Sequence, residues 1–314
     1  MSGKNRRFVT FGALVAPLVI VVLATILSLE VGDRFRTELA SRFEADAETS
    51  LRSATDGLDG YSDLLYAGRA MSLSSEKVTT SEWRTFYNQQ SLFDRYPGVS
   101  SIAYVESVPT AELTAFEQQM KSPDYFGPSF RLDEMSQRPQ HSLVSSYISQ
   151  NDLTAIVGMD LTRLDDRNAV YESAAAKGAV VASPPFKLAT GYEGFFSVLA
   201  VYRNDTLDGF VLSSFRFDTL MKRLFSDESF GYRVTDVTTT KPTQLYASSG
   251  FDTTGYLLER KFDVGGRAWK VEITRDIDTR AVGFLLPAAI MTTALILAAT
   301  MYLYSIRASG RRAP

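Results

Sequence analysis

Two long apolar runs without a charged residue stand near opposite ends of the chain, from Phe8 to Leu29 and from Ala281 to Ile306. At about 1.5 Å of helix rise per residue, either run is long enough to cross a hydrocarbon core of roughly 30 Å. Between them the chain is polar, with short apolar segments of changing period. The pattern predicts two transmembrane helices, 8–29 and 281–306, that bracket a folded polar region.

Apolar residues recur at helical spacing after the first run, as far as Tyr66. They are Phe35, Leu39, Phe43, Leu51, Leu58, Tyr61 and Leu65. Residues three, four or seven apart share one side of a helix, so this pattern predicts an amphipathic helix that continues the first span outward as a stalk. Its apolar side can pack against the chain's own domain or form a seam with a second copy, and the sequence leaves both open.

The middle of the chain alternates short helical and strand patterns. Helices are predicted at 80–94, 111–120, 165–177 and 219–225, and strands at 99–108, 143–148, 195–202, 209–217, 231–237, 244–248, 257–264 and 267–274. Gly265 and Gly266 form a strong hairpin signal between the last two strands. In the final strand Trp269, Val271 and Ile273 alternate with polar residues, which is typical of a half-buried antiparallel sheet.

These elements predict an α+β fold class in which two similar small domains follow the stalk. Roughly 250 residues lie outside the two spans, enough for one large domain or two small ones. We expect stalk and linker helices at 30–94, a membrane-distal domain at 95–204 and a membrane-proximal domain at 205–280.

The distribution of charge predicts the orientation of the chain. Basic residues stand on the far side of each apolar run, namely Lys4, Arg6, Arg7, Arg307, Arg311 and Arg312. All 36 acidic residues lie between Glu30 and Asp278. The positive-inside rule then places residues 1–7 and 307–314 in the cytoplasm of a bacterium, and residues 30–280 outside its inner membrane, in the periplasm. A cleaved signal peptide is the alternative, but the first run exceeds the usual apolar stretch of about 7–15 residues and no A-x-A site closes it.

Composition excludes several kinds of chemistry. The chain has no cysteine and a single histidine, His141, which excludes disulfides, thiol catalysis and Cys- or His-rich metal sites. The acidic outer region argues against nucleic-acid binding. The sequence contains no P-loop, G-x-S-x-G or H-E-x-x-H motif. No spacing marks an acid–base pair among the isolated acids Glu106, Glu112, Asp124, Asp133 and Glu193. We therefore predict no enzyme activity and no cofactor.

One segment carries a family resemblance. Gly158-Met159-Asp160 precedes the helix at 165–177, and Gly178 through Phe186 (GAVVASPPF) leads into the strand that ends near Tyr202. In order and spacing, and with the earlier Tyr96-Pro97-Gly98 turn and strand, this segment resembles the CHASE domain. That family is the extracellular sensory module of many histidine kinases and nucleotide cyclases, including plant cytokinin receptors. The resemblance covers about residues 90–220.

The resemblance implies two tandem PAS-like domains on the stalk, the membrane-distal one holding the ligand. It also implies the ligand-binding residues, which are Asp160, Tyr104, Phe130, Ala182 and Ser183. In cytokinin-binding members an aspartate at the position of Asp160 contacts the adenine ring, as a carboxylate can by accepting charge-assisted hydrogen bonds. Asp160 can instead tie down backbone amides near the start of the helix. At Ala182 cytokinin binders carry a larger aliphatic residue, so cytokinin specificity does not transfer.

Our main hypothesis is a membrane-anchored extracytoplasmic sensor. It would bind a small molecule, for which adenine-like chemistry is one candidate, and form a homodimer through the stalk helix. It would pass the signal to a kinase or nucleotide-cyclase output in the same chain or in a partner. A ligand does this only if it binds one arrangement better than another. The alternatives are a ligand-free structural or protein-interaction subunit and a periplasmic hydrolase.

Overall fold

The computed structural model describes residues 3–133, 135–151, 156–276 and 279–310. It separates into two compact units. The helical unit comprises the chain up to Asp46, a short segment at Thr254–Tyr256, and the chain from Arg275 onward. The sheet unit comprises Ala47–Thr253 and Leu257–Thr274.

The helical unit contains the start of the long helix α1 (Gly3–Ser74) and the last helix, α7 (Thr279–Gly310). Both contain segments long and apolar enough to cross a membrane, and the two predicted spans lie inside these helices. The Ser28 hydroxyl donates to the carbonyl of Pro287 at 3.1 Å. Gly32 faces the same proline, so a small residue allows close approach, as between helices in a bilayer. Arg311 and Arg312, part of the predicted cytoplasmic end, lie outside the described residues.

The helical unit also contains the junction between the stalk and the last strand of the chain. The ring of Phe43 on α1 stacks on that of Tyr256 with centroids 5.5 Å apart. Arg275, which ends the last strand, forms an ion pair of 3.0 Å with Asp46. The strand that leads into α7 is therefore tied to α1 by a ring stack and a salt bridge.

The larger sheet of the sheet unit is antiparallel, in the order β2-β1-β6-β5-β3, and β4 also pairs with β5. Its strands are β1 (Val99–Pro109), β2 (Gln140–Ser149), β3 (Val181–Ala182), β4 (Phe186–Lys187), β5 (Glu193–Arg203) and β6 (Thr206–Arg216). The helices that accompany it are α2 (Thr80–Gln89), α3 (Leu92–Arg95), the 3-10 turn η1 (Thr110–Glu112), α4 (Leu113–Met120), α5 (Asp165–Lys177) and α6 (Phe217–Leu224).

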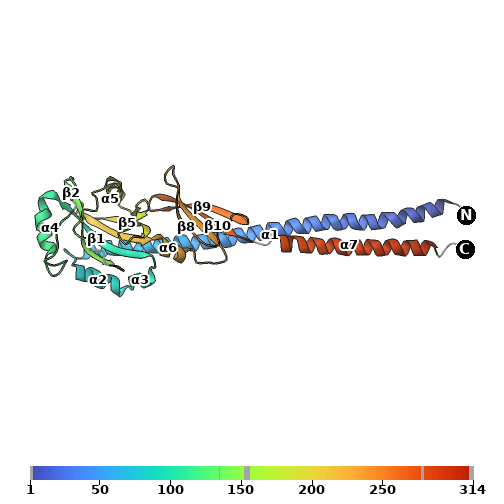
Figure 1. Ribbon diagram of the computed structural model, residues 1–314, viewed down its shortest axis with the longest axis horizontal. Coiled ribbons are helices and arrows are strands. Elements are labelled where there is room, and N and C mark those ends of the chain that lie inside the picture. Colours follow the sequence, from blue (N-terminus) through green and yellow to red (C-terminus); the bar gives the residue numbers. More distant parts are fainter. Residues whose placement is uncertain (1–2, 134, 152–155, 277–278, 311–314) are drawn as a thin grey trace. The chain divides into compact units, whose positions relative to one another are not determined.

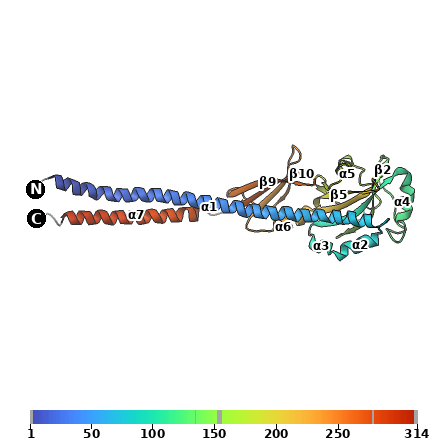
Figure 2. The same ribbon diagram turned by 180° about the vertical axis from the view of Figure 1, so that it is seen from behind.

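Helices cover both faces of this sheet, with α5 on one side and α2 and α3 on the other (Figures 1 and 2). Trp83 of α2 donates its indole N–H to the carbonyl of Ile102 at 3.2 Å, and Tyr87 donates to the carbonyl of Leu64 in α1. On the other face, Ala103 belongs to the core cluster that packs against Tyr171 of α5. Because side chains alternate along a strand, adjacent residues of β1 pack into apolar cores on opposite faces of the sheet.

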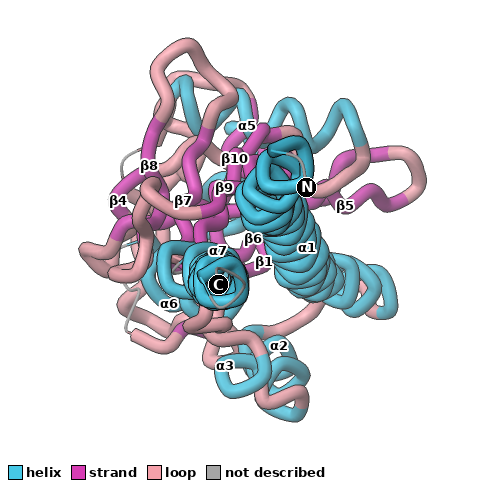
Figure 3. The backbone as a smooth tube through the Cα atoms, turned by 90° about the vertical axis from the view of Figure 1, so that its right-hand side faces the viewer, coloured by secondary structure: helices cyan, strands magenta, loops and turns pink. Residues whose placement is uncertain are grey.

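The second sheet has four antiparallel strands in the order β8-β7-β10-β9. Its strands are β7 (Gly231–Asp236), β8 (Thr243–Ala247), β9 (Tyr256–Val264) and β10 (Arg267–Arg275), drawn in magenta with the others in Figure 3. The predicted apolar face of β10 is buried. Its polar face departs from the half-buried pattern at Glu272, which is only 3% exposed. Arg233 of β7 explains this burial, because its guanidinium binds both carboxylate oxygens of Glu272.

The predicted helices and strands are found, but the short strands β3 and β4 were not predicted, and some elements divide at other residues. The helix expected at 80–94 is two helices, because Ser91 adopts a left-handed backbone with φ of 50°. The expected domain boundary at residue 205 does not follow the sheets. Strand β6 lies between β1 and β5 of the first sheet, so Asn204 and Asp205 form a tight hairpin turn inside that sheet and not a linker.

Candidate ligand cleft

A cavity of about 320 Å³ lies against the α5 side of the first sheet, and we call it the sheet cleft. Its floor comes from the sheet itself, through Ala103, Val144, Phe196 and Leu212. The remaining lining residues are Ser100, Ser101, Ile156, Met159, Leu161, Arg163, Arg167, Tyr171, Phe186, Lys187, Leu188, Ala189, Thr190 and Ser214. Cavities of this size with apolar walls and a few polar groups hold small organic molecules.

Tyr171 and Thr190 contribute hydroxyl groups to the lining. Tyr171 is 2% exposed, and its ring packs edge-on against Phe210 with centroids 4.9 Å apart. Burial raises the pKa of this phenol well above its usual range, so it stays a neutral donor. The Thr190 hydroxyl is buried and unpartnered within the described chain. Buried polar atoms are normally satisfied, so this hydroxyl is available to a ligand.

The rim of the cleft is cationic. Arg163, Arg167 and Lys187 contribute to its lining. The guanidinium of Arg167, in the first turn of α5, lies over the ring of Phe186 at 4.8 Å from its centroid. This stacking holds the charge at one place over the cleft wall.

The structure places Asp160 beneath this cleft and not on its lining. Its side chain is fully buried. One oxygen, Oδ1, accepts from the Ser142 N–H at 3.1 Å, the Thr162 N–H at 3.0 Å and the Thr162 hydroxyl at 2.7 Å. The other, Oδ2, faces His141 Nδ1 at 3.0 Å and accepts from the Ser136 N–H at 3.3 Å. Burial alone would raise the pKa of Asp160, but these hydrogen bonds outweigh it and lower the pKa to about 2.

This geometry favours the second of the two roles considered for Asp160, a brace that ties backbone amides together. The preceding Gly158 makes the local turn possible. It has φ of +88°, and a Cβ there would lie 2.0 Å from the carbonyl oxygen of Arg131. Met159 and Leu161, on either side of Asp160, do line the cleft. The Gly-x-Asp motif therefore shapes the cleft wall while its acid faces inward.

The other four residues expected to bind ligand also lie off the cleft lining. Tyr104 is on the opposite side of β1 from Ala103 and donates to the Asp208 carboxylate at 2.5 Å. Phe130 is 4% exposed, in a separate apolar cluster beside α4. Ala182 pairs with Ser197 at the sheet edge, and the Ser183 hydroxyl accepts from the Phe196 N–H at 3.0 Å. The structure does not bring these side chains together around one space.

Sequence patterns could have predicted some of the residues that line the cleft, but not all of them. In β1, strand alternation separates Ala103 from Tyr104, and an Ala-rich helix needs small or apolar partners on the face it covers. Arg167 could be placed in the first turn of α5, because it follows two acids that favour the start of a helix. No local sequence pattern predicts that Thr190 and Lys187 line the cleft. They do so because of the path that the chain takes around β4.

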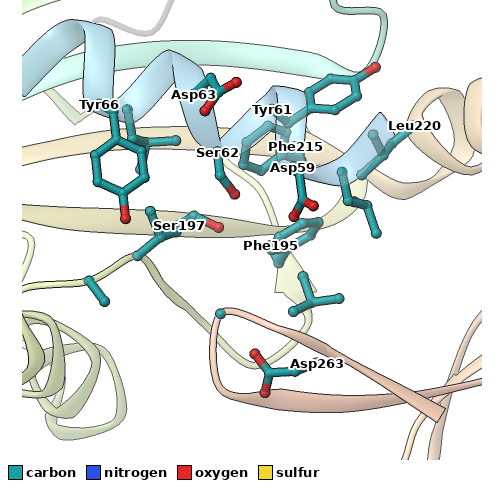
Figure 4. Close-up of a pocket in the computed structure, with 16 residues that line it drawn as sticks. Asp59, Tyr61, Ser62, Asp63, Tyr66, Phe195, Ser197, Phe215, Leu220 and Asp263 are labelled. Atoms are coloured by element: carbon teal, nitrogen blue, oxygen red, sulfur yellow. The ribbon is translucent and has the colours of Figure 1, made fainter. Parts of the chain in front are cut away.

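A second cleft, of about 390 Å³, lies between α1, the first sheet and the turn that joins β9 to β10. Figure 4 shows Ser62 and Tyr66 of α1 facing Ser197, with Asp263 of the turn across the gap. Residues of α1 and of this turn lie outside the range in which the family resemblance was found. This cleft is the larger of the two, and it lies at the joint between the two sheets.

The first sheet and the second are linked beside this joint. The Ala182 N–H donates to the Gly265 carbonyl at 2.9 Å, so β3 holds the β9–β10 turn directly. Gly265 has φ of +57°, and a Cβ there would lie 2.6 Å from the Ala182 nitrogen. The rings of Phe195 and Trp269 also meet edge-on, with centroids 5.3 Å apart. Ala182 and Ser183 thus connect the cleft wall at Phe196 to the second sheet.

Comparison with known proteins gives one family match. The CHASE domain profile matches residues 76–246, just over half of the chain, and this range contains every residue of the sheet cleft lining. No curated protein sequence matches the chain significantly.

Solved structures with a similar arrangement are ligand-binding domains of bacterial receptors. One is the ligand-binding domain of the Pseudomonas fluorescens chemoreceptor CtaA in complex with L-isoleucine, at 11% identity and a TM-score of 0.48, covering 80% of this chain and 98% of that one. Another is that of PctB from Pseudomonas aeruginosa PAO1 in complex with L-Arg, at 12% identity and a TM-score of 0.47, covering 78% and 97%. An extracellular ligand binding receptor from Desulfohalobium retbaense matches at 13% identity and a TM-score of 0.43, with 71% of this chain covering 39% of its length.

The family match rests on the segment that builds the cleft, from the stalk end through both edges of the first sheet. Two apolar helices, α1 and α7, flank that segment. By the extent of this match, the chain belongs to the CHASE domain family, a family of extracellular sensory domains.

Proposed function

We propose that the chain is a membrane-anchored sensor whose sheet cleft binds a small molecule outside the cell. The observation that carries the proposal is a cleft of about 320 Å³ with an apolar floor, lined by the Tyr171 phenol and by a buried Thr190 hydroxyl that lacks a partner in the described chain. A ligand that fills the space satisfies this hydroxyl. The two sheets would then be tandem PAS-like domains, the first for binding and the second for transmission.

The contacts beside the cleft support a route for transmission. Phe196 lines the cleft, and its N–H is held by Ser183. Ala182, the residue before Ser183, donates its N–H to the carbonyl of Gly265 in the turn between β9 and β10. A ligand that moves Phe196 therefore moves the start of β10, the strand that leads toward α7. The second cleft (Figure 4) leaves room for this turn to shift against α1.

The orientation and the partners are part of the same proposal. Basic residues at both ends support a topology with the termini in the cytoplasm and the two sheets in the periplasm. The stalk helix α1 would form the homodimer seam, and a kinase or nucleotide cyclase in the same chain or a partner would read the shift of α7. The described chain shows no cluster of three metal-binding side chains, and the proposed role needs none.

A cleft-filling variant tests the binding function. The full chain in lipid nanodiscs is screened against nucleobases, amines, amino acids and organic acids, and unfolding is followed by tryptophan fluorescence. Trp83 and Trp269 are both fully buried in the sheet unit, so the signal reports on that unit. We expect saturable stabilisation by at least one compound, lost in Ala103→Phe.

Ala111→Phe adds the same ring at an exposed position of η1 and should bind like the wild type. If no compound stabilises the wild type, or if Ala103→Phe binds as well, the cleft is not a ligand site. A ligand-free interaction subunit would then be the better account of the chain.

A further inference from the structure

The charge of the sheet cleft limits the chemical class of its occupant. The described lining residues include three cations, Arg163, Arg167 and Lys187, and neither an aspartate nor a glutamate. This contrasts with the chain as a whole, which carries 36 acidic against 33 basic residues. Cationic side chains concentrated at the mouth of an otherwise apolar cleft attract anions and oppose cations.

Two acids near the lining bear on this conclusion. Glu193 of β5 is the cross-strand partner of Lys187 but is not part of the lining. Asp160 lies under the floor between Met159 and Leu161 and is ionised at neutral pH, since its pKa is about 2. Its two oxygens are, however, surrounded by donors from its own chain, at 2.7–3.3 Å. A carboxylate so enclosed has no free acceptor to offer and does not reach the cleft surface, so it provides no partner for a ligand ammonium group.

The positions of the cations and hydroxyls divide the cleft into two ends. Arg167 is held over Phe186 at the rim, and Lys187 of β4 also contributes to the lining. The hydroxyls of Tyr171 and Thr190 lie among apolar walls, as does the hydroxyl pair of Ser101 and Ser214, 2.6 Å apart. A molecule with an anionic head and an apolar body matches this division.

Resting on the proposed function, we infer that the sheet cleft binds a small organic acid with an apolar body, its carboxylate facing Arg167 and Lys187. The same geometry disfavours a neutral adenine-type ring held by Asp160, since that carboxylate is already occupied. It also disfavours amino acids relative to the matching simple acids. Their ammonium group would find no carboxylate among the described lining residues.

Matched compounds on one carbon skeleton test this inference. 3-Phenylpropanoate carries the acid, 3-phenylpropanamide removes the charge, L-phenylalanine adds an ammonium group, and 3-phenylpropylamine reverses the charge. A second set uses 4-methylpentanoate, its amide and L-leucine. Kd values are measured by calorimetry and thermal shift on the full chain in nanodiscs. We expect the acid of each set to bind roughly 10-fold or more tightly than its amide, because a charge-assisted hydrogen bond is lost.

A matched pair of arginine variants separates the charge from the fold. Arg167→Gln should raise the Kd of the acids roughly 10- to 100-fold and leave that of the amides unchanged. Arg95→Gln is the control, because Arg95 also lies over a ring, that of Tyr96 at 5.6 Å, but outside the cleft lining. It should leave both values unchanged.

The outcomes distinguish this inference from the function beneath it. If the amide, the amine or an adenine derivative binds as tightly as the acid, or if Arg167→Gln has no effect on acids, the inference is overturned while the cleft remains a ligand site. Failure of both acid sets at millimolar concentration also overturns it. The proposed function falls only if the wider screen yields no compound whose binding Ala103→Phe removes.

Discussion

Replacing Asp160 by asparagine separates a structural brace from a ligand contact. An amide in place of the carboxylate keeps one acceptor for the Ser142 and Thr162 donors but puts an N–H₂ group where Oδ2 now stands. That group faces the Ser136 N–H and the ring of His141. Two donors then point at each other in a site with no access to solvent. The variant should fold but with lower stability.

The size of the loss follows from two independent routes. The pKa of Asp160 falls from 3.8 to about 2 in the fold. At about 1.4 kcal/mol per pKa unit this corresponds to about 2 kcal/mol. The loss of one buried hydrogen bond to a charged group costs about 1.5–3 kcal/mol. Both routes lead to about 2 kcal/mol, or a fall in Tm of roughly 4–8 °C for a unit of this size.

The pH dependence provides a sharper signature than the Tm alone. A carboxyl whose pKa is lowered by folding stabilises the fold above its unfolded pKa, and this stabilisation disappears as the pH falls through the folded value. The wild type should therefore lose about 2 kcal/mol of unfolding free energy between about pH 4 and pH 2. Asp160→Asn lacks this contribution at every pH and should show no such loss. The two unfolding curves should converge at the acid end of this range.

The assay is urea unfolding of the full chain in nanodiscs, followed by tryptophan fluorescence between about pH 7 and pH 2. Asp205→Asn, in the exposed β5–β6 turn, is the control and should match the wild type. The reasoning fails if Asp160→Asn unfolds like the wild type at pH 7. If that variant also loses binding of a ligand found in the screen, the carboxylate contacts ligand, as the family resemblance implied.

Two further substitutions probe the second sheet. Gly265→Ala should destabilise the fold by about 1–3 kcal/mol, since φ is +57° and its Cβ would lie 2.6 Å from an amide nitrogen of β3. Gly250→Ala, whose Cβ meets no atom within 4 Å, should be neutral in the same thermal melts, and equal losses would refute the argument. Hydrogen bonds from Arg233 lower the pKa of buried Glu272 to about 2 against partial opposition from burial. Glu272→Gln should therefore remove a stabilisation that the wild type loses only between about pH 4.5 and pH 2, and an unchanged urea midpoint at pH 7 would contradict this.

The secondary structure could be predicted from the chain because its signals are local. The helix expected at 165–177 coincides with α5, since acids mark its first turn and Gly178, with φ of 61°, ends it. The uninterrupted α1 follows from apolar spacing that continues past the first span. Periodicity could not reveal the break at Ser91, because a left-handed residue inside a polar stretch leaves the pattern intact.

Sheet membership and the cleft depended on contacts between distant parts of the chain. Strand β6 pairs with β1, so the turn at Asn204 and Asp205 lies within one sheet although it has the composition of a domain boundary. The cleft lining alternates with the residues first expected there: Ala103 lies beside Tyr104, and Met159 beside Asp160.

The sequence by itself determined two apolar helices, the long stalk, the helix and strand order, and a family whose members sense signals outside the cell. All of these rest on spacing between near neighbours. Only the tertiary structure decided which face of β1 meets α5, and therefore which side chains surround the cleft and what charge they carry. A strand exposes its two faces equally until other elements cover them, so the choice between adjacent residues belongs to the packing of the whole domain.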